Sequence, residues 1–572
     1  MKFIGKLFLT LLLLALLLLV VFYVLMQTAW GANWVTKWVN QHTEYQLSLG
    51  KIDHNWSSPS HILLQDVIFG HKNQPATIVA KQISIGLSIR QITDPSHITS
   101  LQLKGGTLNL DQTNITLPID ADTLQLSDMA LHAQDSNWQL NGQQINGGIM
   151  PWKPEAGYLL GKKANFQLSA RSLILNNIPA SQVLVQGEIN GNQLALNNFG
   201  ANVARGELTG NAIRTEDGSW QINNLRLSNV RFQTNQTLAD FWQPLTQLPA
   251  LTVNRFDLIG ARMEGKNWAF NDLDVTLQNV TFKQNDWQSE DGSLSFNATD
   301  IINGQMHLVD PIVSLDLSPQ GLAIKQFSTR WEGGLLRTDG TWQRSNHRLD
   351  LNEFIVAGME YTLPGDWRQR WQQALPSWLS EVFVKKFSAN RNLLIDINPD
   401  FPFQLTALDG FGNNLLLARD HQLGIWGGSL NLNASDATFN KIDVRHPSLV
   451  LNANNNQITL TDLSAFTQTG LLEAKGIINQ QPTRNFTLEL NGKAVNFGIL
   501  SHWGWTTPPA LPAGNSNFQL HLTGKLDASM PLKPTLNGML QGMDGKGLPI
   551  RQEMRQGTVL ENTPTEQNNN QQ

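Results

Sequence analysis

The sequence contains no cysteine in its 572 residues. This absence excludes disulfide cross-links, thiolate zinc sites, cysteine-bound iron–sulfur clusters and cysteine nucleophiles. Charge is also scarce, because Asp, Glu, Lys and Arg make up 15% of the residues, against roughly 25% in most soluble globular proteins. The net charge of −5 is small and slightly acidic. The chain therefore lacks the basic surface that proteins use to bind nucleic acids.

Recognised catalytic motifs are missing as well. The sequence has no His-Glu-x-x-His zinc helix, no Gly-x-Ser-x-Gly elbow and no Gly-x-Gly-x-x-Gly loop. Residues 260–267 resemble a phosphate-binding loop, but Asn267 stands where a Ser or Thr would bind magnesium, and the flanks alternate like strands. The 12 histidines lack the spacing of metal ligands. We expect no enzyme, no cofactor and no metal site, unless distant polar residues converge in space as in a β-rich hydrolase.

One long apolar run stands near the start of the chain, at residues 7–26. At 1.5 Å per residue, a helix of this length spans about 30 Å, the thickness of a bilayer core. Lys2 and Lys6 precede the run, and no charge follows until Lys37, which predicts a cytoplasmic N-terminus at residues 1–6. A cleaved signal peptide would have a shorter apolar region, followed by a cleavage site with small residues. We therefore expect an uncleaved signal anchor.

The next segment, residues 27–44, is predicted to be an amphipathic helix. Trp30, Trp34 and Trp38 recur every fourth residue and so share one face of that helix. Tryptophan concentrates in the headgroup layer of membranes, and this predicts that the three residues lie at the membrane interface. A helix packed against the first strands would explain the same spacing.

From residue 45 to residue 556 the dominant hydrophobic period is two. Alternating segments include 101–103, 114–117, 123–126 and 518–522, and Asn-Gly or Asp-Gly dipeptides separate many of the later ones. Strict alternation is typical of half-buried antiparallel strands, and those dipeptides favour tight hairpin turns. The sequence predicts a mostly β, elongated, antiparallel body with a few short amphipathic helices.

Two short phrases recur along this body. The pattern Leu-x-Asp/Asn-Val-x-Phe occurs at 64–69, 227–232 and 277–282, with a weaker copy at 126–131. A glycine-flanked short strand occurs at 206–210, 333–340 and 470–476. The irregular spacing excludes a fixed-period solenoid. Either the chain is built from related units, or similar strands resemble one another by chance.

Helices are expected at only two places in the body. Residues 237–248 and 366–383 carry apolar side chains at helical spacing, and Pro376 would divide the second segment into two short helices. The proline-rich stretch 508–512 predicts a linker or turn. The polar end at 557–572 is low in complexity and is predicted to be disordered.

These few helices cannot cover the apolar faces of so many one-sided strands. Either two sheets pack face to face, or a curved sheet leaves an apolar trough that receives a ligand. Acyl chains suit such a trough, because they need no hydrogen bonds and gain about 0.8 kcal/mol per buried CH₂. The alternating apolar residues that are candidates for the lining, or for ordinary core, are Leu108, Leu110, Leu124, Leu126, Phe518, Leu520 and Leu522.

Several longer phrases resemble the AsmA family of Gram-negative inner-membrane proteins, most closely its YicH branch. They are MKFIGKL at 1–7, PSHILLQDVIFG at 59–70, RWEGGLLR at 330–337, LLIDINPDFP at 393–402, LTALDG at 405–410 and GLLEA at 470–474. The resemblance covers the chain except for its polar tail.

The resemblance implies a single-pass inner-membrane protein with a periplasmic, β-rich body related to bridge-like lipid-transfer proteins. It implies a role in outer-membrane biogenesis and carries no catalytic residue. Our leading hypothesis is that an apolar β-groove shields and transfers phospholipid acyl chains, with the inner membrane as a partner and another envelope protein as a further candidate partner. The alternative is a scaffold for the assembly of outer-membrane proteins that transports no lipid.

Overall fold

A computed structural model gives the architecture of the protein. The described residues are 2–54, 58–110, 119–134, 139–155, 158, 160–246, 249–284, 286–480, 484–505, 514–526, 531–543, 547 and 549–560. The strand predicted at 114–117, the linker predicted at 508–512 and the tail from residue 561 lie outside them. The chain divides into two compact units, Met1–Gln288 and Ser289–Gln572.

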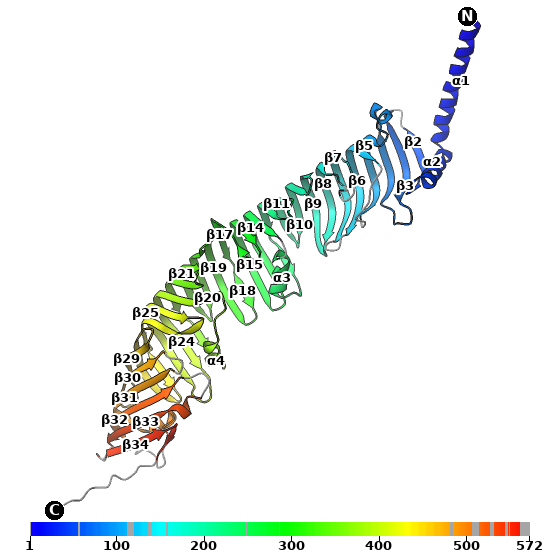
Figure 1. The fold of residues 1–572 in the computed structure, drawn as a ribbon. Coiled ribbons are helices and arrows are strands. Elements are labelled where there is room, and N and C mark those ends of the chain that lie inside the picture. The colour runs from blue at the N-terminus through cyan, green and yellow to red at the C-terminus, as the bar shows by residue number, and fades with distance from the viewer. Residues whose placement is uncertain are drawn as a thin grey trace, which may run out of the picture. The chain divides into compact units, whose positions relative to one another are not determined.

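The first unit begins with two helices and continues as a sheet (Figure 1). The helices are α1 (Lys2–Met26), α2 (Ala29–His42), the short 3-10 helix η1 (Ile89–Ile92) and α3 (Leu238–Thr246). The strands are β1 (Tyr45–Ser48), β2 (Lys51–His54), β3 (His61–His71), β4 (Ile78–Gly86), β5 (His97–Asn109), β6 (Asp120–Gln134), β7 (Gln139–Met150), β8 (Lys163–Leu175), β9 (Ile178–Asn190), β10 (Gln193–Val203), β11 (Gly206–Arg214), β12 (Trp220–Ser228), β13 (Arg231–Gln233), β14 (Ala250–Gly265), β15 (Trp268–Lys283) and β16 (Asp286–Trp287).

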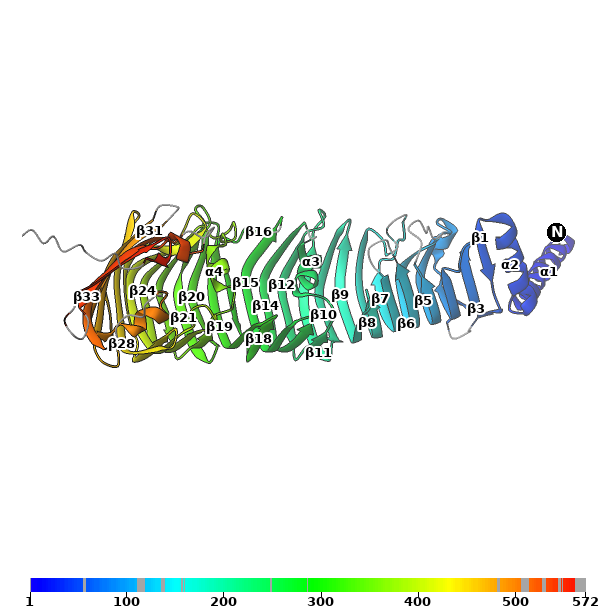
Figure 2. The ribbon, with the colours of Figure 1, turned by 90° about the horizontal axis from the view of Figure 1, so that it is seen from below.

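Neighbouring strands of this unit follow one another in chain order, as Figure 2 shows. Strand β3 pairs with both β1 and β2, and from β6 to β12 each strand is antiparallel to the next. Parallel pairs occur where a longer connection returns the chain to the same end of the sheet, between β5 and β6 and between β12 and β14. Helix α3 lies in the second of these connections and confirms the helix predicted at 237–248 for its described part.

The second unit repeats this construction. Its helices are α4 (Trp367–Gln372), α5 (Gly498–His502) and the 3-10 helix η2 (Lys533–Thr535). Its strands are β17 (Gly292–Asn297), β18 (Asp300–Asn303), β19 (Met306–Ser318), β20 (Gly321–Trp331), β21 (Gly334–Gln343), β22 (Arg348–Ala357), β23 (Glu360–Thr362), β24 (Glu381–Asp396), β25 (Phe403–Arg419), β26 (Gln422–Asn433), β27 (Asp436–Phe439), β28 (Ile442–Ala453), β29 (Gln457–Phe466), β30 (Leu471–Asn479), β31 (Asn485–Asn496), β32 (Asn515–Lys525), β33 (Asn537–Met543), β34 (Pro549–Arg555) and β35 (Thr558–Val559). The prediction of a mostly β, hairpin-built chain is confirmed.

The helix predicted at 366–383 is wrong over most of its length. Only Trp367–Gln372 is α-helical, and from Glu381 the chain forms β24, which pairs in parallel with β22. Pro376 cannot donate a backbone hydrogen bond and prevents the helix from continuing. Val382 and Val384 then find partners on the neighbouring strand, because β-branched residues pack well on a pleated surface.

The recurring Leu-x-Asp/Asn phrase has a conformational cause. Its third residue adopts a left-handed backbone in every copy, with φ of 51° at Asp66, 55° at Asp128, 56° at Asn229 and 51° at Asn279. Asp and Asn tolerate this conformation better than other residues with a side chain. At each of these residues the pairing is interrupted or the strand ends. This shared geometry favours repetition of a structural unit over chance recurrence.

The glycine-flanked phrase also falls at equivalent places. Its copies lie at the start of β11, β21 and β30. A short helix follows each of these strands after one or two further strands: α3 after β12 and β13, α4 after β22 and β23, and α5 after β31. The predicted polar tail begins inside the sheet, because β35 pairs with β34 through Thr558 and Val559. The strand region therefore extends slightly past its predicted end at residue 556.

Candidate functional site

Helix α1 is the candidate membrane anchor. Among the described residues, its segment Phe8–Met26 is long and apolar enough to cross a membrane. Its 19 residues correspond to about 28 Å of helix, close to the thickness of a bilayer core. The side chains of Phe8 and Leu17 are 70% and 60% exposed. A helix that presents apolar side chains on its surface requires an apolar solvent, and this one fits a membrane anchor.

Helix α2 joins this anchor to the sheet. The side-chain amide of Asn40 donates to the Leu47 carbonyl oxygen at 3.0 Å, and its oxygen accepts from the Leu47 N–H at 2.7 Å. Ala32 is buried and Val35 packs on the same apolar cluster as the first strands. The end of α1 is also tied to the sheet, because the Tyr23 hydroxyl hydrogen-bonds to Nδ1 of His54 on β2.

The three tryptophans of α2 lie on its other face. Trp30, Trp34 and Trp38 are 48–52% exposed, and the Trp38 ring stacks on the ring of His42. The two explanations of their spacing therefore apply to different faces of one helix, since α2 packs on the strands and still presents its tryptophans outward. Their place beside the anchor agrees with a membrane interface, which stays a prediction.

Beyond α2, one face of the first sheet is apolar. Leu101 and Leu103 on β5 lie opposite Leu124 and Leu126 on β6, while the intervening Gln102 and Gln125 face the other side of the sheet. A single cluster of buried and half-buried apolar side chains continues on this face from Ala32 of α2 to Leu196 of β10. We call it the apolar face of the first unit.

Three of the four predicted lining residues of this unit, Leu108, Leu124 and Leu126, belong to the apolar face. Leu124 and Leu126 are only 5% and 7% exposed, so their side chains are already packed against protein. Leu108 and Leu110 are half-buried. More open positions occur farther along the face, where apolar side chains are half-buried. They are Leu168, Val183, Val185, Ile189, Leu194 and Leu196.

The other predicted lining residues belong to the second unit and lie in a closed cluster. Phe518 and Leu520 are buried and Leu522 packs beside them, together with Leu500 of α5. The ring centroids of Phe518 and the fully buried Phe497 are 5.4 Å apart. Helix α5 therefore contributes to covering this part of the sheet. The sequence signal for α5 was weak, because Val495, Phe497 and Ile499 continue the alternation and only the adjacent pair Ile499-Leu500 breaks it.

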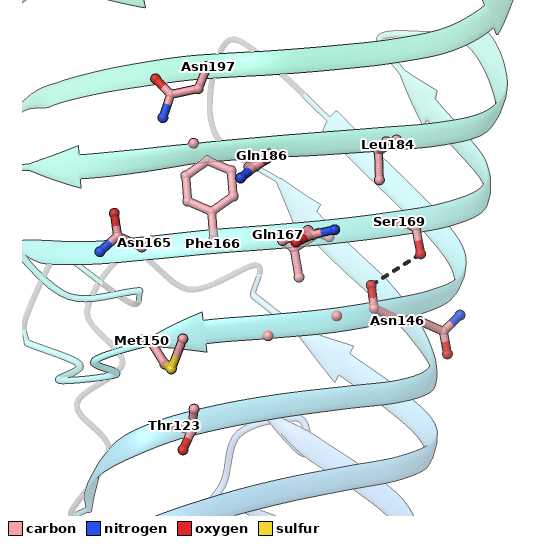
Figure 3. Close-up of a pocket in the computed structure, with 14 residues that line it drawn as sticks. Thr123, Asn146, Met150, Asn165, Phe166, Gln167, Ser169, Leu184, Gln186 and Asn197 are labelled. Carbon is pink, nitrogen blue, oxygen red and sulfur yellow. Dashed lines mark hydrogen bonds between the residues drawn. The ribbon is translucent and has the colours of Figure 1, made fainter.

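Sequence reasoning also missed a hollow on the polar face of the first sheet. It measures about 600 Å³ and is lined from β6, β7, β8 and β9, and by Asn197 of β10. Figure 3 shows Asn165 and Gln167 on β8 between Gln186 on β9 and Met150 on β7. A second hollow of about 420 Å³ adjoins it and shares Asn146, Ser169 and Leu184. In the sequence, amides at alternating strand positions, such as Asn165 and Gln167, cannot be told from the polar residues of any solvent-exposed strand face.

Some charged groups of the first unit form local contacts. Nζ of Lys51 lies 3.0 Å from Oδ2 of Asp53, and this hydrogen bond lowers the pKa of the Asp53 carboxyl. The buried ring of His97 contacts Oδ2 of Asp120 at 3.1 Å and Oδ1 of Asp122 at 3.2 Å, which ties β5 to the start of β6. Within the described part of the chain, no group of His, Asp or Glu side chains is arranged to hold a metal ion.

Comparison with known proteins identifies a close relative. The chain is 49% identical over 560 residues to the AsmA family protein YicH of Escherichia coli (strain K12), and the match covers 98% of each chain. No model of a known protein family matches the chain. No solved structure matches it either.

Proposed function

The chain belongs to the AsmA family, and from this membership we propose that the protein acts in the cell envelope, where its apolar face shields phospholipid acyl chains. In this proposal α1 spans the inner membrane, with Lys2 and Lys6 in the cytoplasm. The sheet then lies in the periplasm and carries lipid for outer-membrane biogenesis. Neither a catalytic residue nor a cofactor is needed for such a role.

The observation that carries the proposal is the continuity of the apolar face with the membrane anchor. The cluster includes Ala32 and Val35 of α2, which follows α1 after two residues, and it runs without a break to Leu196 of β10. An acyl chain that leaves the bilayer beside α1 therefore meets apolar side chains from the first strands onward. This continuity supports a membrane lipid, in preference to a water-soluble ligand, as the molecule that binds the apolar face.

The energetics suit acyl chains. Moving a CH₂ group from water into apolar surroundings is favourable by about 0.8 kcal/mol, and an acyl chain brings no polar group that would need a partner. The half-buried Val183 and Val185 on β9 offer surface for such contacts without unpacking Leu124 or Leu126. The charged headgroup can remain in water at the open side of the sheet.

The alternation along β9 provides the test. A photo-crosslinking amino acid is placed at Val183 or Val185, which lie on the apolar face, and at Leu184 or Gln186, which lie on the other face. After irradiation of cells, adducts are identified by mass spectrometry. We expect phospholipid adducts at the two valine positions and few at their neighbours. Equal labelling of both sets would contradict the proposal.

A second candidate function rests on the closed cluster of the second unit. Phe497, Phe518 and Trp505 are buried together there, and a packed interior of this kind is what a scaffold without lipid transport requires. If crosslinking at Val183 and Val185 captures an envelope protein and no lipid, the scaffold is the better account.

A further inference from the structure

Most side chains that line the polar hollow of the first unit lie on the face opposite the apolar face, and Phe166 and Leu168 of the apolar cluster complete its lining. Lipid transport along the apolar face gives the polar side chains of the hollow no role. The side chains of Asn165, Gln167 and Ser169 alternate along β8 with Phe166 and Leu168, which belong to the apolar cluster. Figure 3 shows how the strands carry these polar groups side by side. The site is therefore built by the polar residues of several adjacent strands.

Gly147, Gly148 and Gly187 are among the residues that line the hollow, and of these Gly148 lies opposite Gln167 on the polar face. Gly147 and Gly187 have no room for a side chain, since a Cβ atom would lie 2.0 Å from the Gln167 oxygen and 2.2 Å from the Ala195 oxygen, respectively. Gly148 differs, because a Cβ there would meet only the Leu124 oxygen at an ordinary 3.7 Å. Neither packing nor backbone conformation requires a glycine at position 148, and a larger residue would fill the space.

The amides of the hollow are available for a ligand. The side chains of Asn165, Gln167, Gln186 and Asn197 are exposed and have no hydrogen-bond partner among the residues that the structure describes. Gln167 and Gln186 lie directly opposite each other on β8 and β9. Each amide offers two donor hydrogens and one acceptor oxygen. The residues that line this hollow include no Asp, Glu, Lys or Arg.

We propose that this hollow binds a neutral, hydroxyl-rich glycan. Hydroxyl groups both donate and accept hydrogen bonds, as the unpaired amides do, and a neutral ligand needs no counter-charge. The exposed side chains of Met150 and Leu184 at the hollow provide apolar contacts for the C–H faces of sugar rings. The adjoining hollow, which shares Asn146, extends the site beyond one ring and favours an oligomer.

Other ligand classes fit less well. A phosphate or carboxylate ligand would find no cationic side chain in the larger hollow; Arg171, in the adjoining one, already donates to the Gln144 side-chain oxygen at 3.2 Å. A peptide cannot bind by strand addition, because β8 is already paired with β7 and β9 on its two edges. An acyl chain would strip water from the amides without replacing their hydrogen bonds.

The test uses the full chain in detergent, titrated with the neutral oligosaccharides chitohexaose and maltohexaose and followed by ligand-observed NMR. We expect at least one of them to bind. Gln167→Ala combined with Gln186→Ala should weaken that binding at least about fivefold, since each neutral hydrogen bond contributes a factor of about two to ten. Gly148→Leu should weaken it by blocking the hollow.

The matched control is the pair Gln519 and Gln541, which also face each other across neighbouring strands, β32 and β33. Replacing both with alanine should leave binding unchanged. An unchanged circular-dichroism spectrum shows that each variant is folded, and Gly148→Leu tests the site without removing an amide. The proposal is overturned if neither sugar binds, if a neutral peptide binds in their place, or if both test variants bind as tightly as the control.

Discussion

Leu168 on β8 lies directly opposite Val185 on β9, and the next pair along the same two strands is Gln167 opposite Gln186. Leu168 and Val185 belong to the apolar face, and both glutamines line the polar hollow, to whose lining Leu168 also contributes. One step along the strand thus separates a surface suited to hydrocarbon from a surface suited to hydroxyl groups. Val185 belongs only to the apolar cluster and Gln186 only to the lining of the hollow, so substitutions at these two neighbouring positions test the two surfaces separately.

A charge on the apolar face should interrupt the lipid path. Val185→Asp places a carboxylate among apolar side chains on β9, and burying that charge beside an acyl chain is strongly unfavourable. We expect lipid crosslinking at Leu196 on β10 to fall severalfold, while crosslinking at Leu64 on β3 is kept. Gln186→Asp, on the other face, serves as the control. Unchanged lipid crosslinking at Leu196 in the Val185→Asp variant would argue against lipid movement along this face.

The docking of α2 on the sheet should depend on Asn40. Asn40→Ala removes both hydrogen bonds to Leu47, each of which contributes about 0.5–1.5 kcal/mol. Hydrogen exchange at the Leu47 amide should become faster by about tenfold or more. Lys37→Ala changes an exposed residue of the same helix and should have no such effect; equal exchange in both variants would show that α2 is held by other contacts.

The tryptophan face of α2 should lie at the membrane surface. A nitroxide spin label at position 34, which is half-exposed, should be reached by oxygen from the bilayer more readily than by a water-soluble nickel complex. A label at the exposed position 37 provides the comparison. If position 34 shows the same aqueous access as position 37, the tryptophans do not contact the membrane.

The closed cluster beneath α5 should determine the stability of its region. Phe497 is fully buried against Phe518, and replacing a buried phenylalanine with alanine costs about 3–5 kcal/mol of unfolding free energy. Phe497→Ala and Phe518→Ala should both show this loss in denaturant-induced unfolding of the full chain. Leu184→Ala, at an exposed site, should change stability by less than about 0.5 kcal/mol. A stable Phe518→Ala variant would restore Phe518 as a lining residue.

Alternation was a sound guide to strands and to their faces, because a period of two follows directly from strand geometry. It placed Leu124, Leu126 and Phe518 on apolar faces correctly. It could not show what covers each face, since the contact of Phe518 with Phe497 joins residues through tertiary packing. For the same reason the end of the helix expected over 366–383 was missed: from Glu381 the chain forms β24, whose pairing with β22 is a long-range contact.

The polar hollow lay beyond sequence reasoning for a different reason. Its shape depends on the register that sets Gln167 opposite Gln186 and Gly148 opposite Gln167, and hydrophobic alternation alone does not reveal register. The Leu-x-Asp/Asn repeat, by contrast, was visible early because the left-handed backbone at Asp66 and Asp128 restricts the residue type at one position.

The central claim is that the apolar face carries acyl chains along its whole length from the membrane anchor, and β10 is the last strand of that face. A photo-crosslinker at Leu196, on the apolar face, is therefore compared in cells with one at the exposed Asn197 beside it. Our account predicts phospholipid adducts at Leu196 and few at Asn197. Absence of phospholipid at Leu196, or equal labelling of the two positions, would contradict it.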